Sequence, residues 1–292
     1  MPRKVLNNKL LRTIKMLRKR GYGYRRIQRF LREKYGIEAS NSTLHYWIRD
    51  KLKDWNVMPL VTSEIPWEPR RGPELAYIIG VALGDGSAGS YKRSDRNERR
   101  YQFRLMVRDK EFAEAVKKAI EGLGLHCNMW EYYERRKEST YYRVDCYVKR
   151  FALFLRDIKE HPEKAWQWIE GYESYFIRGF YESEGSLGAN GYIEIYNKRR
   201  EYIDIVAKCL QRLGIKYSIL FRDLGAYKRL WIVYIPVRDT KRFLTMVRPV
   251  IKYSIDDPHY QRVKREREER RRRNKTQRPP QAPISTCKII VE

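Results

Sequence analysis

The chain has 292 residues, enough for two or three small domains, and its hydrophobic content of 42% excludes wholesale disorder. It contains no stretch of ~18 uncharged apolar residues and no apolar N-terminal run, which excludes a membrane span and a signal peptide and predicts a cytoplasmic, nucleoid-associated protein. The formal net charge of +27 predicts a polyanionic partner, because each neutralised phosphate releases counterions. Charge alone does not distinguish DNA from RNA or from an acidic membrane surface.

Residues 1–52 have the pattern of a small, basic, all-α domain. Apolar residues recur at helical spacing from Leu6 to Leu17, a second helix ends near Gly36, and Ser40 is placed to cap a third. This order resembles the helix-turn-helix of resolvases and transposases, which implies that the third helix enters the major groove. Its exposed side would present the following residues to DNA: Thr43, His45, Tyr46 and Arg49. A basic bundle that only contacts phosphates is the alternative.

Two further segments differ in composition from the rest of the chain. Residues 53–73 hold four prolines and little periodicity, so we expect a linker, with Trp55 and Trp67 as points where it docks. Residues 257–292 form a basic tail that starts as a helix rich in Arg and Glu. This helix is either a solvated charge run or an additional contact to DNA.

Between these segments the chain repeats itself. Residues 74–170 and 171–256 each predict the order αββαββα, and the two copies start about a hundred residues apart. An internal repeat of this length implies two similar sub-domains related by a pseudo-twofold axis. The predicted fold class is therefore α+β, with a separate small helical domain.

The first helix of each copy carries the most informative motif. Residues 77–87 (YIIGVALGDGS) align with residues 176–186 (FIRGFYESEGS), so that Asp85 matches Glu184. Two helices can cross closely only where small residues meet, and Gly80, Gly84, Gly179 and Ser183 supply such a ridge. The crossing would make the two carboxylates neighbours. At ~4 Å and an effective dielectric of 20 they would repel by about 4 kcal/mol, which predicts a bound cation or a bound proton.

The paired motifs resemble those of the LAGLIDADG homing endonucleases over residues 74 to about 256. The resemblance implies a saddle of two sheets that binds double-stranded DNA, with Asp85 and Glu184 as catalytic metal ligands and Gly84 and Ser183 as the other metal-site residues. Hard oxygen ligands with no nearby His or Cys favour Mg²⁺, with Mn²⁺ as a substitute. The alternative is that both motifs are ordinary helix ends at glycine, with no metal site.

The same resemblance assigns further catalytic roles beside the metal. The matching positions at the end of the second strand of each half are Asp109 with Lys110, and Asn197 with Lys198. Lysines there would stabilise charge on the phosphate, and Asn197 would orient a water. Asp109 departs from the family's usual amide, which puts the first half's site in doubt. Lys252 resembles a basic residue that the family places near the cleft.

Strand alternation predicts which side chains face DNA. If Phe103, Leu105 and Val107 point into the core, their neighbours point outward. The residues assigned to the DNA-facing surface on this basis are Gln102, Arg104, Tyr141, Arg143, Tyr192, Lys216 and Arg222. The hairpin loop of the first half is much longer than that of the second, so a monomer would read an asymmetric site.

The four cysteines show no metal-ligand spacing. A two-residue turn at 136–137 would place Cys127 opposite Cys146, where either a cross-strand disulfide or two reduced thiols would fit.

We therefore expect an intron-encoded or free-standing homing endonuclease that makes a Mg²⁺-dependent double-strand cut. Two alternatives remain open: a DNA-binding regulator that does not cleave, and a maturase acting on the RNA of its host intron.

Overall fold

The computed structural model describes residues 8–48, 67–92, 99–135, 138–223 and 229–275. Its N-terminal part consists of three helices packed around buried Ile14, Ile27 and Leu44: α1 (Asn8–Lys19), α2 (Tyr24–Tyr35) and α3 (Asn41–Tyr46). Gly36 ends α2 in the left-handed conformation, and the Ser40 hydroxyl caps α3 by accepting a hydrogen bond from the Thr43 N–H. The predicted Arg49 lies outside the described residues.

The first half of the repeat has the predicted order of elements. They are α4 (Pro73–Leu83), β1 (Ser87–Lys92), β2 (Arg99–Val107), α5 (Lys110–Gly122), β3 (Asn128–Glu134), β4 (Ser139–Cys146) and α6 (Lys149–Glu160). The four strands form an antiparallel sheet in the order β1-β2-β4-β3.

A short 3₁₀ turn at Pro162–Ala165 and helix α7 (Trp166–Ile169), neither of which was predicted, lead to the second half. Its elements are α8 (Glu173–Glu184), β5 (Gly185–Leu187), β6 (Ile193–Asn197), α9 (Arg200–Arg212), β7 (Ser218–Asp223), β8 (Arg229–Ile235) and α10 (Val237–Val247). The sheet order β5-β6-β8-β7 repeats that of the first half, and the chain continues into α11 (Pro258–Lys275).

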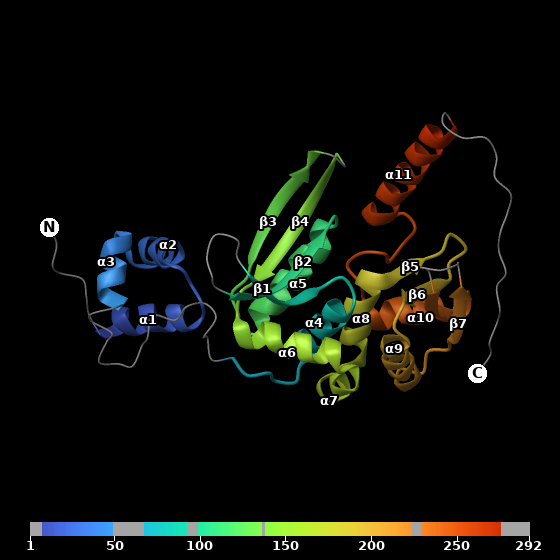
Figure 1. The fold of residues 1–292 in the computed structure, drawn as a ribbon, viewed down its shortest axis with the longest axis horizontal. Coiled ribbons are helices and arrows are strands. Elements are labelled where there is room, and N and C mark those ends of the chain that lie inside the picture. The colour runs from blue at the N-terminus through green and yellow to red at the C-terminus, as the bar shows by residue number, and fades with distance from the viewer. Residues whose placement is uncertain (1–7, 49–66, 93–98, 136–137, 224–228, 276–292) are drawn as a thin grey trace.

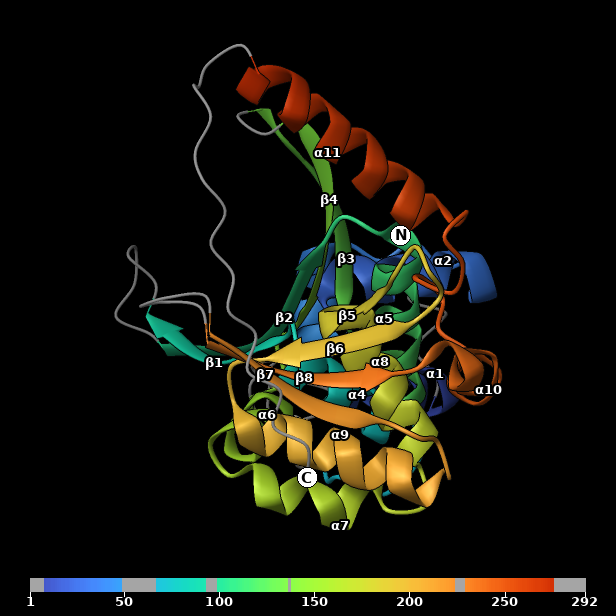
Figure 2. The same cartoon turned by 90° about the vertical axis from the view of Figure 1, so that its right-hand side faces the viewer.

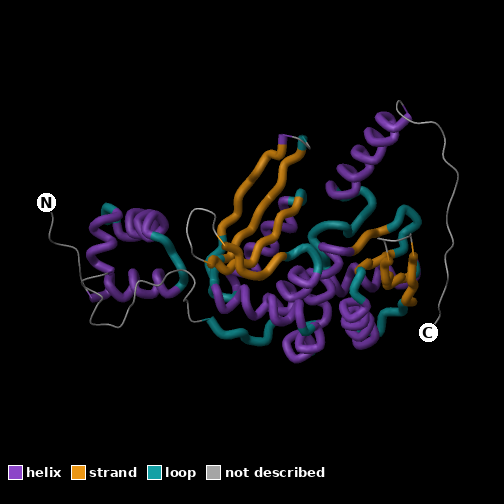
Figure 3. Tube along the Cα trace, viewed as in Figure 1, coloured by secondary structure: helices purple, strands orange, loops and turns teal. Residues whose placement is uncertain are grey.

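The two halves are arranged side by side, with helices packed on one face of each sheet (Figures 1 and 2). Figure 3 shows the two groups of strands and the helices between and below them. Phe103, Leu105 and Val107 are buried, as alternation predicted, and their neighbours on the strand leave the opposite face partly open. The predicted α+β fold with two similar halves is confirmed.

The register of the β3–β4 hairpin also agrees with the sequence-based pairing. Asn128 pairs with Asp145 and Glu134 with Ser139, as a turn at 136–137 requires. Cys127 and Cys146 are buried and carry free thiols, and burial raises the pKa of each to about 12. These thiols therefore pack as small apolar side chains.

The described end of the predicted linker docks on the first half. Trp67 is buried and contacts the rings of Phe151 and Phe154 edge-on, with centroid distances of 5.1 and 5.6 Å. Trp55 lies outside the described residues. Among the described helices, none combines the length and the apolar composition needed to cross a membrane.

Candidate metal centre and DNA-facing surface

The centre of the molecule is the crossing of α4 and α8, where the two backbones touch. A Cβ atom on Gly80 would lie 2.2 Å from the Phe176 carbonyl oxygen, and one on Gly179 would lie 2.2 Å from the Tyr77 carbonyl oxygen. One turn further on, a Cβ on Gly84 would lie 2.4 Å from the Ser183 Cβ. The two helices therefore touch through the ridge of small residues, and this close crossing brings the C-terminal ends of both helices together.

Two carboxylates stand at these adjoining ends. Glu184 is the last residue of α8 and is half-buried, while Asp85 follows α4 and is exposed on one side. Partial burial and then the negative charge of Asp85 raise the pKa of Glu184 to about 7, and partial burial also raises the pKa of Asp85. Each carboxylate thus lies within the other's electrostatic field, in a position that favours a bound cation.

A lysine lies beneath each of the two helix ends. Lys252 Nζ donates to the carbonyl oxygens of Glu182 and Ser183, at 2.7 and 3.2 Å. Lys159 Nζ donates to those of Ala82 and Gly86, both at 2.6 Å. Burial lowers the pKa of both lysines, and the positive charge of each in turn lowers the pKa of Asp85 and Glu184. The two ammonium groups thus counter the negative ends of both helix dipoles.

The backbone at Lys252 is unusual. Its φ of +64° lies in the left-handed region, which costs a non-glycine residue of the order of 1–3 kcal/mol. The Tyr181 hydroxyl holds this conformation by donating to the Lys252 carbonyl oxygen at 2.7 Å. The fold thus maintains a strained residue so that its side chain reaches the end of α8.

The four predicted residues beside the carboxylates occupy different environments. Asn197 lies near the centre, with its Nδ2 donating to Glu184 Oε1 at 3.3 Å. Lys198 and Lys110 are exposed, and Lys110 is 3.8 Å from Glu114 on its own helix. Asp109 is instead held by α11: its Oδ2 is 3.1 Å from His259 Nδ1 and 3.0 Å from Arg262 Nη2.

The contacts with α11 change the chemistry of Asp109. Burial alone would raise the pKa of this carboxyl, but the His259 and Arg262 interactions outweigh burial and lower it. The Asp109 carboxylate is therefore paired with His259 and Arg262 of α11, whereas the Asn197 side chain in the other half reaches Glu184. The two halves thus differ chemically at corresponding positions.

The outer face of the first sheet carries a buried acid that holds two arginines. Asp145 is fully buried, and it accepts from Arg104 Nε at 2.7 Å and lies 2.9 Å from Arg143 Nε. Gln102 accepts from Arg104 Nη2 at 3.2 Å, so the guanidinium group is fixed on both sides. Arginines held in this way present their remaining N–H groups in a defined direction.

The second sheet has a smaller version of this arrangement. Glu194 lies 3.6 Å from Arg222 Nη2 and accepts from the Tyr196 hydroxyl. Tyr192 and Lys216 are half-buried and exposed, respectively, and Tyr141 of the first half is also half-buried. All of these side chains remain accessible on or beside the face that the helices leave uncovered.

Sequence reasoning missed several residues of these surfaces. Lys159 belongs to a helix with ordinary periodicity, and only the parallel with Lys252 at the end of the other repeat would have indicated it. Trp130 and Tyr132 are exposed on β3 opposite Arg143 and Tyr141, so they share the outer face. The β3–β4 register would have assigned both to that face. The complete burial of Asp145 beneath Arg104 and Arg143 was also not expected.

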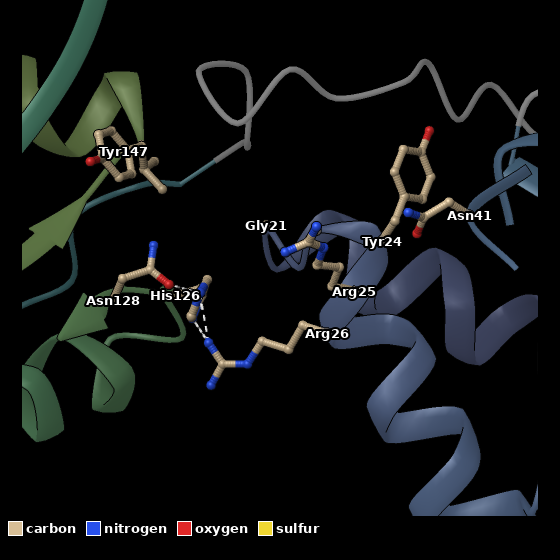
Figure 4. A pocket seen from close by; sticks show the side chains of 10 residues that line it. Gly21, Tyr24, Arg25, Arg26, Asn41, His126, Asn128 and Tyr147 are labelled. Atoms are coloured by element: carbon tan, nitrogen blue, oxygen red, sulfur yellow. Dashed lines mark hydrogen bonds between the residues drawn. The ribbon is translucent and has the colours of Figure 1, made fainter. Parts of the chain in front are cut away.

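The N-terminal helices contact the first half through α2. Arg26 Nη1 lies 2.5 Å from His126 Nδ1, and Arg26 Nη2 lies 3.9 Å from Glu121 Oε1. Burial and the Arg26 charge lower the pKa of His126 to about 4, so this ring is neutral. Figure 4 shows the pocket of about 490 Å³ beside this contact, with Arg25 and Tyr24 on one side and Asn128 and Tyr147 on the other. On α3, His45 and Tyr46 are exposed and Thr43 is half-buried.

The raised pKa of Glu184 leads to a prediction about stability. Its ordinary value is 4.5, so the folded state binds this proton more tightly than the unfolded state, and the free energy of unfolding should fall as pH rises from about 4.5 to about 7. In Glu184→Gln the side chain does not titrate, so this fall in the free energy of unfolding should be absent. Chemical denaturation should therefore show the variant gaining about 2 kcal/mol relative to wild type between about pH 5 and pH 8.

Glu163→Gln is the control, because this glutamate is exposed and lies outside the two crossing helices. A stability difference between Glu184→Gln and wild type that does not change with pH would contradict the raised pKa. Addition of Mg²⁺ at pH 8 should stabilise wild type more than Glu184→Gln.

Comparison with known proteins gives a family for the repeat. A family model described as a LAGLIDADG-like domain matches residues 171–248, and one described as the WhiA LAGLIDADG-like domain matches residues 75–161. The protein MJ0398 of Methanocaldococcus jannaschii, described as uncharacterized, is 31% identical over 210 residues, which cover 72% of each chain.

Homing endonuclease I-DmoI of Desulfurococcus mucosus is 24% identical over 174 residues, or 58% of this chain and 84% of that protein. A crystal structure of I-DmoI in complex with DNA and Mn covers 60% of this chain and 96% of its own, at 20% identity and a TM-score of 0.48. Each half of the present chain thus matches a LAGLIDADG-like domain. The chain therefore belongs to the double LAGLIDADG-like proteins and is related to the homing endonuclease I-DmoI.

Proposed function

We propose that the chain is a Mg²⁺-dependent, site-specific DNA endonuclease that cuts both strands of a long asymmetric site. One observation carries the proposal: Asp85 and Glu184 come from different halves and meet at the ends of two crossing helices, where partial burial and then the Asp85 charge raise the pKa of Glu184 to about 7. A fold that only needed to pack two helices would gain nothing from placing two carboxylates there. A divalent cation offsets their repulsion and both helix dipoles.

The donor set suits a hard cation. Asp85 and Glu184 would hold Mg²⁺, and the residues before them, Gly84 and Ser183, would add carbonyl oxygens. Among the described residues, no group of three or more His, Cys, Asp and Glu side chains is arranged for a metal ion, so DNA phosphates and water would complete the coordination. When bound, Mg²⁺ or Mn²⁺ would supply a water of lowered pKa and positive charge at the leaving oxygen.

The remaining residues would position the substrate and the ligands. Asn197 would orient a water beside Glu184, and the exposed Lys110 and Lys198 would contact the phosphates next to the cut. Lys252 and Lys159 would hold the helix ends, so that the carboxylates keep their spacing when the metal binds. We assign Asp109 to positioning, because its carboxylate is already paired with His259 and Arg262.

The DNA partner is supported by the charge and by the paired sheet faces. Arg104 and Arg143 on the first sheet and Arg222 on the second would read base edges in the major groove, where a guanidinium pairs with guanine. The residues proposed to contact DNA beside them are Gln102, Tyr141, Tyr192 and Lys216. A single chain with unlike halves would bind its site as a monomer.

We further propose that α1–α3 form a helix-turn-helix domain that extends this site. The Ser40-capped helix α3 exposes His45 and Tyr46, with Thr43 and the following Arg49 as further contacts. The Arg26–His126 contact places this domain beside the first half, so the extension would lie at that end of the DNA.

The test is cutting of a plasmid library that carries randomised inserts, analysed by sequencing of the linearised products. Wild-type protein should linearise a small, related set of plasmids with Mg²⁺ and bind the same set without cutting when Ca²⁺ replaces Mg²⁺. Specific binding with no cutting in Mg²⁺ or Mn²⁺ would overturn the endonuclease proposal.

A DNA-binding protein that does not cleave is the second candidate, and the state of Asp109 favours it. Its carboxylate is occupied by α11, so the first half lacks a free polar group matching Asn197. Under this alternative, Mg²⁺ and Ca²⁺ would give the same binding and the same intact plasmid.

A further inference from the structure

The two halves differ most in their first hairpin. In the first half, β1 and β2 have six and nine residues, whereas β5 and β6 in the second half have three and five. If the open faces of the two sheets bind DNA as proposed, these hairpins would flank the DNA. The second half therefore has a much shorter hairpin than the first in this position.

Helix α11 stands over the short hairpin. The Leu187 N–H donates to the Tyr260 hydroxyl, which fixes the first turn of α11 to β5. Between the helix and the strands lies a hollow of about 650 Å³, lined on the strand side by Tyr192, Glu194 and Tyr196. These three side chains belong to the outer face of the second sheet, so α11 borders the surface proposed to bind DNA.

The first part of α11, residues 258–266, which we call its base, also contacts the first half. Asp109 pairs with His259 and Arg262, and Arg108 Nη2 lies 2.7 Å from Glu266 Oε1. The buried Asp257 caps the helix by accepting from the Tyr260 N–H at 2.9 Å. Contacts to both halves thus fix residues 258–266 at one orientation relative to the saddle.

Beyond this base the helix has nothing to bury. Residues 264–275 contain no apolar side chain, and residues 267–275 hold six Lys and Arg against two Glu. Nine residues extend a helix by about 13 Å. Figures 1 and 2 show α11 rising from the second half in the same direction as the β3–β4 hairpin of the first. A cationic helix without an apolar face is expected to bind a polyanion rather than to pack against a protein core.

We propose that α11 is a clamp for the DNA backbone that replaces the missing length of the β5–β6 hairpin and contacts phosphates beside the second half. This inference rests on the proposed DNA-binding function, and it assigns part of the affinity to a helix outside the repeat. The contacts of residues 258–266 fix the orientation of the helix, and residues 267–275 supply the charge.

The test is the salt dependence of binding to a 40-base-pair duplex of random sequence, measured by fluorescence anisotropy with Ca²⁺ present. The clamp variant carries four substitutions: Arg270→Gln, Arg271→Gln, Arg272→Gln and Arg273→Gln. Glutamine keeps the helix, so the loss is one of charge. We expect the slope of log Kd against log salt to fall by about 3 and affinity at 150 mM salt to fall by on the order of 100-fold.

A matched control removes the same charge from helices on the other side of the molecule. Its substitutions are Lys118→Gln, Lys208→Gln, Arg238→Gln and Lys241→Gln, all at exposed positions on α5, α9 and α10. This variant should change the slope by less than about 1. Circular dichroism of both variants checks that α11 and the fold persist.

Three results would overturn the clamp: a clamp variant that binds like the control, one that binds duplex more tightly, and one that loses affinity only for a structured RNA of equal length. These results leave the endonuclease proposal untouched if wild type still cuts its plasmid site. Failure of wild type to bind any duplex at low salt would instead overturn the DNA function and the clamp together.

Discussion

Replacing Asp85 by Asn or Glu184 by Gln is expected to reduce DNA cutting by at least about 1000-fold, which corresponds to about 4 kcal/mol of transition-state stabilisation. Each substitution keeps the size of the side chain but removes one of the two negative charges at the helix crossing. Because the carboxylates come from different halves, either loss should leave the cation without half of its charged ligands. The measurement is the rate of plasmid cutting at saturating protein with Mg²⁺.

Measuring DNA binding by the same variants shows whether cutting is lost because a metal ligand is missing or because the protein no longer folds. Both variants should bind duplex in Ca²⁺-free buffer as well as wild type does, or better, because a negative charge facing the phosphates has been removed. Asp204→Asn and Glu163→Gln are matched controls at exposed positions, and both should cut at the wild-type rate. Cutting by Asp85→Asn within about tenfold of wild type would show that this carboxylate is not a ligand of the catalytic metal.

A second large effect is expected at the contact between the helices. In Gly80→Ala or Gly179→Ala, the new methyl group would lie 2.2 Å from a carbonyl oxygen of the facing helix. Backbone atoms in a packed crossing cannot move aside as a flexible side chain would, so α4 and α8 must separate. We expect a loss of about 3 kcal/mol in the free energy of unfolding, a drop in Tm of about 10 °C, and loss of cutting.

Gly72→Ala is the matched control for this prediction. Gly72 precedes the same helix α4, has extended backbone, and has only Glu74 Oε2 near its added Cβ, at 3.7 Å. It should cost less than about 1 kcal/mol. Equal stability of Gly80→Ala and Gly72→Ala in thermal melts would mean that the two backbones do not touch as described.

The fold and the centre of the site could be predicted because they depend on local, repeated signals. Gly80 and Gly179 recur in register with Asp85 and Glu184. A helix that carries small residues and ends at a carboxylate, present twice in one chain, is best explained by a close helix crossing. The strand faces followed from alternation alone. These features do not depend on which distant residues happen to meet.

Other features depend on partners far away in the chain, and no periodicity indicates them. The pair between Arg108 and Glu266 joins residues 158 positions apart, and that between Asp109 and Arg262 joins residues 153 apart. In sequence, α11 is only a run of charges, and its docking becomes visible once the end of β2 and the start of α11 are seen together. Lys159 was missed for the same reason, since its acceptors are carbonyl groups in the last turn of α4 and just after it.

The fusion of two unlike halves across the α4–α8 crossing also affects how the protein can evolve. In a symmetric dimer of identical halves, every mutation appears twice and any change on one side of the axis is copied to the other. Here Asp85 faces Glu184 and Gly84 faces Ser183, and a long hairpin is balanced by a short one. Each half can change in sequence while its partner stays constant, so under the proposed function new DNA specificity would arise one half-site at a time.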